Sequence, residues 1–389
     1  MIETKEQFKD FISYFQKQNG YKNPIGFGIC RVDLGQKDST KVLQATYPLP
    51  NWNENFGSAT VLLSAVEEIG KEIDYSQSES LFPVTPDLIS KALNKFAPFE
   101  GEEGHKNIDL LKILSSRDDL ENFRLVFIFS DEVLKSVEAT YLKLYALSTK
   151  KADLRSLNLG GAFGALHNVA WSGNQPIELD WLRENEMRLK VDGEYPEIDS
   201  VDKFPRFLQH IIPEDNTRIL ETSKVRFGAR LSAGTTVMPG ASYINFNAGT
   251  NGVSMVEGRI SSSAIVGDGS DVGGGASILG VLSGGNADPI SVGEKCLLGA
   301  NSTTGISLGD GCIVDGGVTV LAGTKVVLSE TEREKLQTVN SKKLPEAGNV
   351  RCRDLSGLNG LHFRQDSTTG EMKVFRSTRE IELNSELHN

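Results

Sequence analysis

The chain has 389 residues, of which 39% are hydrophobic and 24% charged, and its 41 Lys and Arg against 52 Asp and Glu give a net charge of −11. This balance is typical of a folded protein and argues against one whose whole surface binds nucleic acid. The chain contains no run of 18 apolar residues and begins without the apolar segment of a signal peptide, so we expect neither a membrane span nor secretion. Its four cysteines are far apart, with no CxxC pair, which argues against a metal cluster or disulfide framework and favours the cytoplasm.

Residues 1–200 are typical of a mixed α/β domain. Apolar residues recur at helical spacing in three segments, and one uninterrupted apolar run is typical of a buried strand. The helical segments are 8–15, 58–72 and 87–96, and the strand is 124–129. A glycine-rich run at 160–164 lacks the Lys-Ser/Thr pair of a phosphate-binding loop, so we expect it to serve close backbone packing.

Glycine is concentrated in a second part of the chain, because 22 of the 39 glycines lie between residues 219 and 326. Aliphatic residues recur there every six positions, and most are followed three residues later by glycine. Short parallel strands that each turn one aliphatic side chain inward, with glycine at tight corners, produce this period. The pattern predicts about six turns of a parallel β-helix, with three hexapeptides to a turn. The aliphatic series runs through Ile219, Val225, Leu231 and Val237, then Ile260, Val266, Val272, Ile278, Ile290, Leu308, Val314, Val320 and Val326.

The period has two interruptions. The register shifts by one residue across 238–259, which predicts an insertion loop there. The small-residue pattern also lapses over 279–289, which indicates either a lid that arches away from the helix or a plain excursion of the chain.

The last part returns to mixed polarity. Residues 329–336 are charged and helix-prone, and two apolar runs at 361–364 and 372–375 flank a turn, which predicts a hairpin. We therefore predict an α/β domain over 1–200, a parallel β-helix over 201–330 and a short β-rich extension over 331–389.

The residues that interrupt the repeat carry the functional information. All five histidines lie outside 219–326, which argues against an acetyltransferase with a catalytic histidine on the β-helix and against a site with three histidine ligands to a metal. Glu257 and Arg259 stand where the interruption rejoins the repeat, and alternation places them on one side of an extended strand. They indicate either a solvated ion pair or a carboxylate base beside a guanidinium that binds an anion. Glycines 273–275 would let backbone N–H groups approach and polarise a carbonyl.

Four motifs closely resemble the tetrahydrodipicolinate N-succinyltransferase family, in the longer form found in actinobacteria and several proteobacteria. The motifs are FNAGT at 246–250, MVEGRIS at 255–261, VGDGSDVGGGAS at 266–277 and CLLGAN at 296–301. The resemblance extends from about residue 194 to residue 367. It implies a homotrimer of left-handed β-helices with active sites between subunits. Succinyl would pass from succinyl-CoA to the amino group of ring-opened tetrahydrodipicolinate, on the route to diaminopimelate and lysine.

The resemblance also implies roles for individual residues. Glu257 matches the catalytic glutamate, which would act either as a general base or as a nucleophile that forms a transient acyl-anhydride. Independently of the motifs, a dicarboxylate acceptor and a succinyl donor both need cationic partners, and Arg226, Arg230 and Arg259 are candidates for this in an otherwise acidic chain. The implied acyl-CoA contacts are Arg259, Gly274, Ser277, Ala300, Asp315, Gly316, Gly323, Arg351, Arg364, Gln365, Asp366 and Ser367. The last run reads Arg-Gln-Asp-Ser, where relatives carry Arg-Arg-Asn-Ser.

No permanent cofactor is expected. Some relatives bind magnesium near the trimer axis through acidic residues, and the matching positions here are Ser223 and Gly240 or Ala241, which offer no carboxylate. We therefore expect no metal at that place. Two alternatives to the succinyltransferase stay open: a hexapeptide acyltransferase that uses acetyl-CoA or another amine, and a non-catalytic β-helix scaffold.

Overall fold

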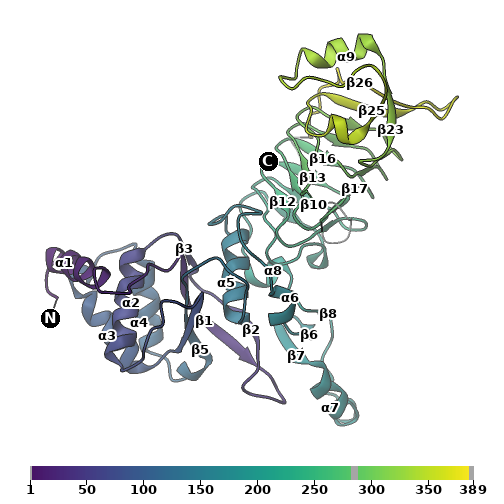
Figure 1. The fold of residues 1–389 in the computed structure, drawn as a ribbon. Helices are drawn as coiled ribbons and strands as arrows, with labels where there is room; N and C mark the ends of the chain where they lie inside the picture. Colours follow the sequence, from purple (N-terminus) through teal and green to yellow (C-terminus); the bar gives the residue numbers. More distant parts are fainter. Residues whose placement is uncertain (1, 282–287, 385–389) are drawn as a thin grey trace. The chain divides into compact units, whose positions relative to one another are not determined.

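The computed structural model describes residues 2–281 and 288–384, and the chain divides into two compact units, Met1–Pro205 and Arg206–Asn389. The first unit is built on an antiparallel sheet of order β2-β1-β5-β4, with β3 paired to β1. Helices α2, α3 and α4 cover one face of this sheet and α5 covers the other (Figure 1). The strands are β1 (Gly26–Leu34), β2 (Val42–Thr46), β3 (Asn51–Trp52), β4 (Glu79–Pro83) and β5 (Phe123–Ile128). The helices are α1 (Lys5–Gln16), α2 (Phe56–Glu68), α3 (Pro86–Lys95), α4 (Lys106–Ser115) and α5 (Val137–Ser148).

The predicted elements of this unit are confirmed, with shifted ends. The three helical segments fall in α1, α2 and α3, and the predicted strand is β5, whose burial on both faces explains its uninterrupted apolar run. The glycine run leads into the short helix α6 (Ala162–Ala165). Gly161 has a φ of 85°, and a Cβ there would lie 2.5 Å from the carbonyl oxygen of Leu134. Close backbone packing therefore accounts for this glycine, as expected.

A smaller antiparallel sheet completes the first unit. Its strands have the order β7-β6-β8, and in the sequence β6 and β7 come before the exposed helix α7 and β8 comes after it. The indole of Trp171 on β6 is buried and donates a hydrogen bond to the carbonyl of Asp202 on β8, which fastens the last strand. The elements are β6 (Val169–Ser172), β7 (Gln175–Glu178), α7 (Leu179–Asp192) and β8 (Ser200–Asp202).

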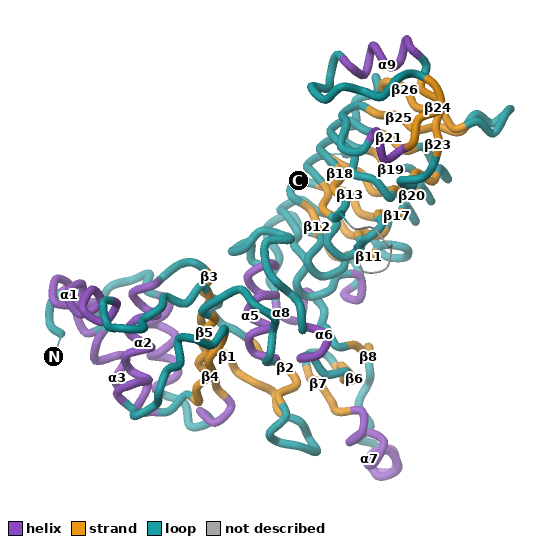
Figure 2. The backbone as a smooth tube through the Cα atoms, viewed as in Figure 1, coloured by secondary structure: helices purple, strands orange, loops and turns teal. Residues whose placement is uncertain are grey.

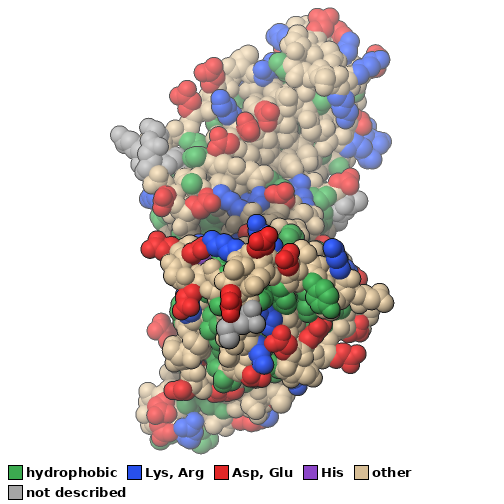
Figure 3. Space-filling view, turned by 90° about the vertical axis from the view of Figure 1, so that its left-hand side faces the viewer, with side chains coloured by type: hydrophobic (Ala, Val, Ile, Leu, Met, Phe, Trp, Pro, Cys, Tyr) green, Lys and Arg blue, Asp and Glu red, His purple; other side chains and the backbone are tan. Residues whose placement is uncertain are grey.

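The second unit is a coil of short parallel strands arranged in three ladders (Figure 2). One aliphatic side chain per strand points inward, as at Val256, Ile260 and Val266, all fully buried in one continuous core. The outer surface of the coil is largely tan in Figure 3, because glycine, serine and threonine occupy many outward positions. The first ladder contains β9 (Arg218–Ile219), β10 (Thr236–Val237), β13 (Ser254–Val256), β16 (Ser270–Val272), β19 (Leu297–Leu298) and β21 (Ile313–Val314). The second contains β11 (Tyr243–Ile244), β14 (Arg259–Ile260), β17 (Ser277–Ile278), β20 (Thr303–Thr304) and β22 (Thr319–Val320), and the third β12 (Gly249–Thr250), β15 (Ile265–Val266) and β18 (Ser291–Val292).

The prediction of an insertion loop over 238–259 is wrong. That interval holds β11, β12, β13 and the start of β14, all paired in register with their neighbours in the coil. The inward residues Val237 and Ile244 are seven apart and Val256 and Ile260 are four apart. A long and a short corner therefore shift the sequence register without interrupting the ladders.

The second interruption does correspond to extra chain. Val256 and its partner Val272 are 16 residues apart, whereas Val272 and its partner Leu298 are 26 apart. The difference lies between β17 and β18, in the segment 279–289 that was expected to form a lid or an excursion. Residues 282–287 of it lie outside the described residues.

The C-terminal segment extends the coil. The predicted hairpin is confirmed as β25 (Leu361–Gln365) and β26 (Met372–Arg376), and β25 also pairs in parallel with β21. Phe363 and Val374 thus join the same hydrophobic cluster as the coil. Between coil and hairpin lie β23 (Lys325–Leu328), the predicted helix, here α9 (Glu330–Gln337), and β24 (Gly348–Arg351), with the short helix α8 (Phe207–His210) opening the unit. None of the helices in the described residues is long and apolar enough to cross a membrane.

Candidate active site

One corner of the coil brings together seven of the fifteen predicted site residues. Five residues near the C-terminal ends of successive strands in the first ladder are stacked in register: Val256, Val272, Leu298, Val314 and Phe363. The two residues that follow each of them form what we call the corner column. In chain order the column contains Glu257 and Gly258, Gly273 and Gly274, Gly299 and Ala300, Asp315 and Gly316, and Arg364 and Gln365. Residues spread over more than 100 positions of sequence therefore lie along one edge.

Small residues keep the middle of this column free of side chains. A Cβ on Gly273 would lie 2.6 Å from the carbonyl oxygen of Leu298, and one on Gly299 would lie 2.5 Å from the nitrogen of Gly316, so neither position accepts a larger residue. Gly274, Ala300 and Gly316 occupy the next position on successive turns. An extended ligand can lie against such an edge in contact with backbone atoms.

Glu257 stands at one end of the column. Its backbone N–H donates to the carbonyl of Val272 at 2.8 Å, and its side chain is half-buried. The Oε2 atom lies 3.7 Å from where a Gly274 Cβ would be, so the carboxylate faces the glycine edge. No ion pair joins Glu257 and Arg259, both of which the structure describes. The carboxylate is therefore not neutralised by the arginine that follows it.

The three glycines at 273–275 do not contribute equally as donors. The N–H of Gly273 donates to Leu298 at 2.8 Å and that of Gly275 to the carbonyl of Glu257 at 3.3 Å. The N–H of Gly274 has no acceptor among the described residues. Of the three glycines expected to polarise a substrate carbonyl, Gly274 is therefore the one whose N–H group is available for that hydrogen bond. Gly274 is also the glycine that the Glu257 carboxylate faces.

Arg259 and Ser277 lie side by side on the neighbouring ladder. They are partners in the parallel pair β14–β17, and Tyr243 precedes Arg259 in the same row. Arg259 is exposed and has no carboxylate partner among the described residues, whereas Ser277 is buried. The guanidinium is available for an anionic ligand group.

The carboxylate of Asp315 is hydrogen-bonded to two side chains of the hairpin strand β25, His362 and Arg364. It accepts hydrogen bonds from Nε of Arg364 at 2.5 Å and from His362 Nε2 at 2.7 Å. Partial burial raises the pKa of Asp315, but these hydrogen bonds outweigh it and hold the pKa below its usual value. Arg364 also lies over the ring of Phe375 at 5.5 Å and remains exposed. Asp315 therefore fixes an arginine at the far end of the corner column.

The remaining predicted contacts from the C-terminal segment are less closely grouped. Arg351 ends β24 beside Lys325, and Gly323 lies in the turn before β23; both are exposed. Gln365 and Asp366 are occupied in their own hairpin turn. Asp366 accepts from the N–H groups of Thr368 and Thr369 and from Lys373, and Gln365 donates to Gly370. Ser367 is exposed at the tip of that turn.

The two predicted substrate arginines lie on the first turn of the coil and are not brought to Glu257. Arg226 donates to the side chain of Asn245 at 3.2 Å on the second ladder. Arg230 is buried and pairs with Gly249 on the third ladder. They therefore occupy different sides of the coil within one chain.

The positions that match the family's magnesium site do not fit a cation. The Ser223 hydroxyl donates to Glu221 at 2.6 Å, and the carbonyl of Gly240 accepts from Lys224 Nζ at 2.7 Å. Neither position offers a carboxylate, and a lysine ammonium already donates to the Gly240 carbonyl, which disfavours a cation there. No group of three His, Cys, Asp or Glu side chains that could hold a metal is found in residues 2–281 and 288–384.

Three family models match the chain. The N-terminal model of tetrahydrodipicolinate N-succinyltransferase matches residues 6–164, its middle model matches 166–206, and a hexapeptide repeat of succinyl-transferase matches 289–322. The 2,3,4,5-tetrahydropyridine-2,6-dicarboxylate N-succinyltransferase of a Nitratiruptor species is 61% identical over 100% of both chains. The chain belongs to the tetrahydrodipicolinate N-succinyltransferase family. The resemblance drawn from its motifs and the acyltransferase class are therefore confirmed.

Further members of the family show how far the similarity extends. The Campylobacter jejuni enzyme of the same name is 58% identical over 100% of both chains, and that of Vibrio cholerae is 45% identical over 68% of this chain and 73% of its own. The crystal structure of a 2,3,4,5-tetrahydropyridine-2-carboxylate N-succinyltransferase from C. jejuni has 57% sequence identity to this chain and a TM-score of 0.94. It covers 98% of this chain and 100% of its own.

Sequence reasoning missed one residue of the candidate site in this family member. His362 was set aside because it lies outside the repeat, yet β25 adds a rung to the coil and brings its imidazole to Asp315. A signal was present, because His362 and Arg364 alternate on one face of the predicted hairpin strand. What the sequence lacked was the partner of that strand, 49 residues away on β21.

Proposed function

We propose that the chain transfers the succinyl group of succinyl-CoA to the amino group of ring-opened tetrahydrodipicolinate, which gives N-succinyl-2-amino-6-oxopimelate and CoA. The observation that carries this proposal is the pairing of the Glu257 carboxylate with the open glycine edge at Gly274. A base and a backbone N–H donor at one place are the two elements that acyl transfer to an amine requires.

In the proposed reaction the amine nitrogen attacks the thioester carbonyl and the C–S bond breaks. Glu257 accepts the proton that the amine loses, and the Gly274 N–H donates to the carbonyl oxygen as its charge grows. The leaving thiolate of CoA takes a proton as the products separate. In the alternative role the Glu257 carboxylate attacks the thioester first, the C–S bond breaks and CoA leaves as the thiolate. The amine then attacks the succinyl carbonyl of the mixed anhydride, which releases the Glu257 carboxylate, and the proton of the amine passes to that carboxylate.

We assign the corner column to the donor. The acyl-CoA would run along Gly274, Ala300 and Gly316, with Arg259 and Arg364 as cationic contacts for its charged groups. Asp315 would orient Arg364 and so act through it. Ser277, Gly323, Arg351 and Ser367 would complete the contacts, whereas the side chains of Gln365 and Asp366 serve the hairpin turn.

We further propose a left-handed β-helix that assembles as a homotrimer with active sites between subunits. The support is the family membership together with the position of Arg226 and Arg230, which lie away from Glu257 within one chain. In a trimer they would serve the corner column of a neighbouring subunit. The four cysteines are free and buried, which supports a reducing cytoplasm as the place of the reaction.

The decisive experiment is a thiol-release assay with the purified protein, succinyl-CoA and tetrahydrodipicolinate. Release of CoA is expected only when the acceptor is present, and the Glu257→Gln variant should lose about 10²-fold or more in kcat. Glu294→Gln, an exposed glutamate elsewhere on the coil, is the matched control and should keep full activity. Full turnover by Glu257→Gln would remove both roles of this residue.

Two further arms identify the donor and the mechanism. Acetyl-CoA in parallel should be the poorer donor, and faster release from it would assign the chain to an acetyl transfer instead. Incubation with succinyl-CoA alone, followed by mass analysis of the intact chain, should show no added succinyl group if Glu257 is a base. A stoichiometric adduct on Glu257 would indicate the anhydride route. An intact trimer without release from either donor would favour the scaffold.

A further inference from the structure

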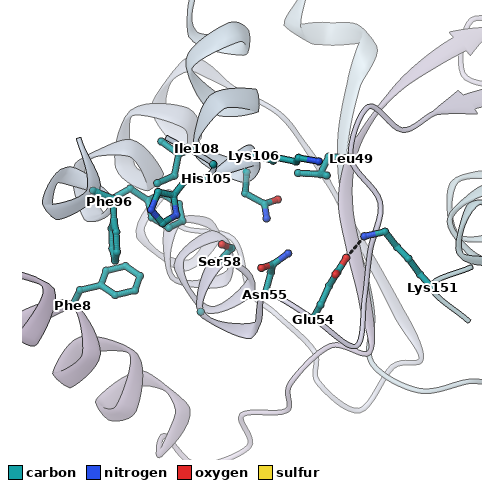
Figure 4. Close-up of a pocket in the computed structure, with 14 residues that line it drawn as sticks. Phe8, Leu49, Glu54, Asn55, Ser58, Phe96, His105, Lys106, Ile108 and Lys151 are labelled. Carbon is teal, nitrogen blue, oxygen red and sulfur yellow. Dashed lines mark hydrogen bonds and ion pairs between the residues drawn. The ribbon is translucent and has the colours of Figure 1, made fainter. Parts of the chain in front are cut away.

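The first unit contains a cavity that the proposed reaction does not use. Its volume is about 390 Å³, and it lies where the starts of α2 and α4 meet α1 and the loops before α2 (Figure 4). All of its lining residues belong to Met1–Pro205 and are described. A cavity of this size holds a small organic molecule.

One end of the cavity is aromatic. The rings of Phe8 and Phe99 meet edge to face with centroids 4.9 Å apart, Phe8 lies 5.9 Å from Phe96, and His105 lies 5.0 Å from Phe99. Figure 4 shows Phe8, Phe96 and His105 together on one side. An apolar or aromatic group of a ligand would be desolvated against these rings.

The middle of the cavity is lined by hydrogen-bond donors. Asn55 and Ser58 lie between the aromatic end and the ion pair of Glu54 with Lys151 (Figure 4). Because Glu54 and Lys151 neutralise each other, the unbalanced charge on the wall is Lys106, which has no carboxylate partner among the described residues. The cavity thus carries a net positive wall in a protein whose overall charge is −11.

Backbone donors reinforce this charge. Neither α2 nor α4 has a side chain that caps its N-terminus, in contrast to α1, α3 and α5, which are capped by Thr4, Thr85 and Ser136. Residues in the first turn of each helix line the cavity, Gly57 and Ser58 in α2 and Lys106 and Asn107 in α4. Two helix starts and one lysine around a single cavity favour an anionic group on whatever occupies it.

We propose that this cavity binds a small organic anion whose charged group meets Lys106 and the starts of α2 and α4, and whose apolar body packs against Phe8, Phe96 and Phe99. The ligand class is a monocarboxylate with an aromatic or branched apolar body. The site lies within the first unit and is independent of the acyl transfer proposed for the coil.

The test uses the full-length protein and isothermal titration calorimetry with four probes. Phenylacetate carries both features, acetate and inorganic phosphate carry only the anion, and benzylamine carries the ring with the opposite charge. Phenylacetate is expected to bind, with the other three at least about tenfold weaker, since each lacks one of the two interactions. No binding of phenylacetate, or equal binding of acetate, phosphate or benzylamine, would overturn the proposal.

Two variants locate the binding. Lys106→Met removes the unbalanced charge and should weaken phenylacetate about tenfold, whereas Lys112→Met, an exposed lysine further along the same helix, should leave it unchanged. Gly57→Asp adds a carboxylate at the start of α2, where an acidic residue stabilises a helix, so the melting temperature should hold or rise. The nearest side-chain atom to the new Cβ is 3.9 Å away in Phe8, which leaves room for the substitution. Phenylacetate binding should nevertheless be lost, and its persistence in Gly57→Asp would place the ligand elsewhere.

Discussion

The two units build their interiors from different side chains. Among the described residues, the main hydrophobic cluster of the first unit contains seven buried phenylalanines, including Phe27 and Phe127 on adjacent strands, whereas that of the coil contains two, Phe207 on α8 and Phe363 on the hairpin strand β25. Three parallel ladders enclose a narrow interior that admits one aliphatic residue per strand. At the corners, the backbone of one turn packs directly on the backbone of the next turn. A sheet covered by helices leaves a wider interior where side chains meet side chains and can shift. The coil should therefore tolerate less change per position than the first unit.

A corner glycine should show the largest difference. A Cβ on Gly267 would lie 2.6 Å from the backbone of Gly293, so Gly267→Ala must displace a neighbouring turn and should cost about 3 kcal/mol or more. Gly164→Ala adds the same atom in the first unit, where nothing lies within 4 Å, and should change stability by less than about 1 kcal/mol. Urea unfolding followed by circular dichroism measures both. Equal midpoints for the two variants would contradict the distinction between the units.

Matched core truncations test whether the units unfold separately. Leu298→Ala in the coil and Leu125→Ala in β5 each empty a fully buried site and should cost about 2–5 kcal/mol. The three tryptophans all lie in the first unit, at 52, 171 and 181, so their fluorescence reports that unit alone. Because each unit has its own hydrophobic cluster, Leu125→Ala should shift the fluorescence transition and Leu298→Ala should not. A fluorescence shift in Leu298→Ala equal to that in Leu125→Ala would mean that the chain unfolds as one cooperative unit.

The same contrast explains what the sequence could predict. A repeated backbone constraint leaves a repeated sequence pattern, so the glycine and aliphatic period predicted the coil. Glu257, by contrast, was placed at the end of an insertion loop, where the structure has regularly paired strands. The period failed between Val237 and Ile260, where one long and one short corner shift the register by one residue, because a count of six cannot distinguish this from an insertion. The cavity around Lys106 was not predictable, and the alternation of His362 with Arg364 could not be interpreted, since both depend on which distant segments pack together.

The smallest expected effect concerns Asp315, whose carboxylate is held by hydrogen bonds from His362 and Arg364 on the hairpin strand β25. Its folded pKa lies below its usual value, so its ionised form contributes stability at pH values above about 4, and this contribution disappears as the pH falls through the lower folded pKa. The urea midpoint of the parent chain should therefore fall more steeply between about pH 6 and pH 3 than that of Asp315→Asn, with the two curves converging at the acidic end. The effect is modest because the carboxylate is partly exposed and water screens its ion pair with Arg364.

The matched control is Asp354→Asn, which changes an exposed aspartate in the second unit just after β24. Its urea midpoint should follow that of the parent chain at every pH. Glu178 provides the counterpart in the first unit: burial raises its pKa, but the N–H of Lys37 and the ammonium of Lys41 outweigh this and lower it. Glu178→Gln should therefore flatten the acid dependence of the tryptophan transition, whereas Asp315→Asn should flatten only the transition seen by circular dichroism. Parallel curves for Asp315→Asn and the parent would mean that the hairpin ion pair does not order this end of the corner column in solution. Arg364 would then have to be positioned by the bound acyl-CoA itself rather than by the protein in advance.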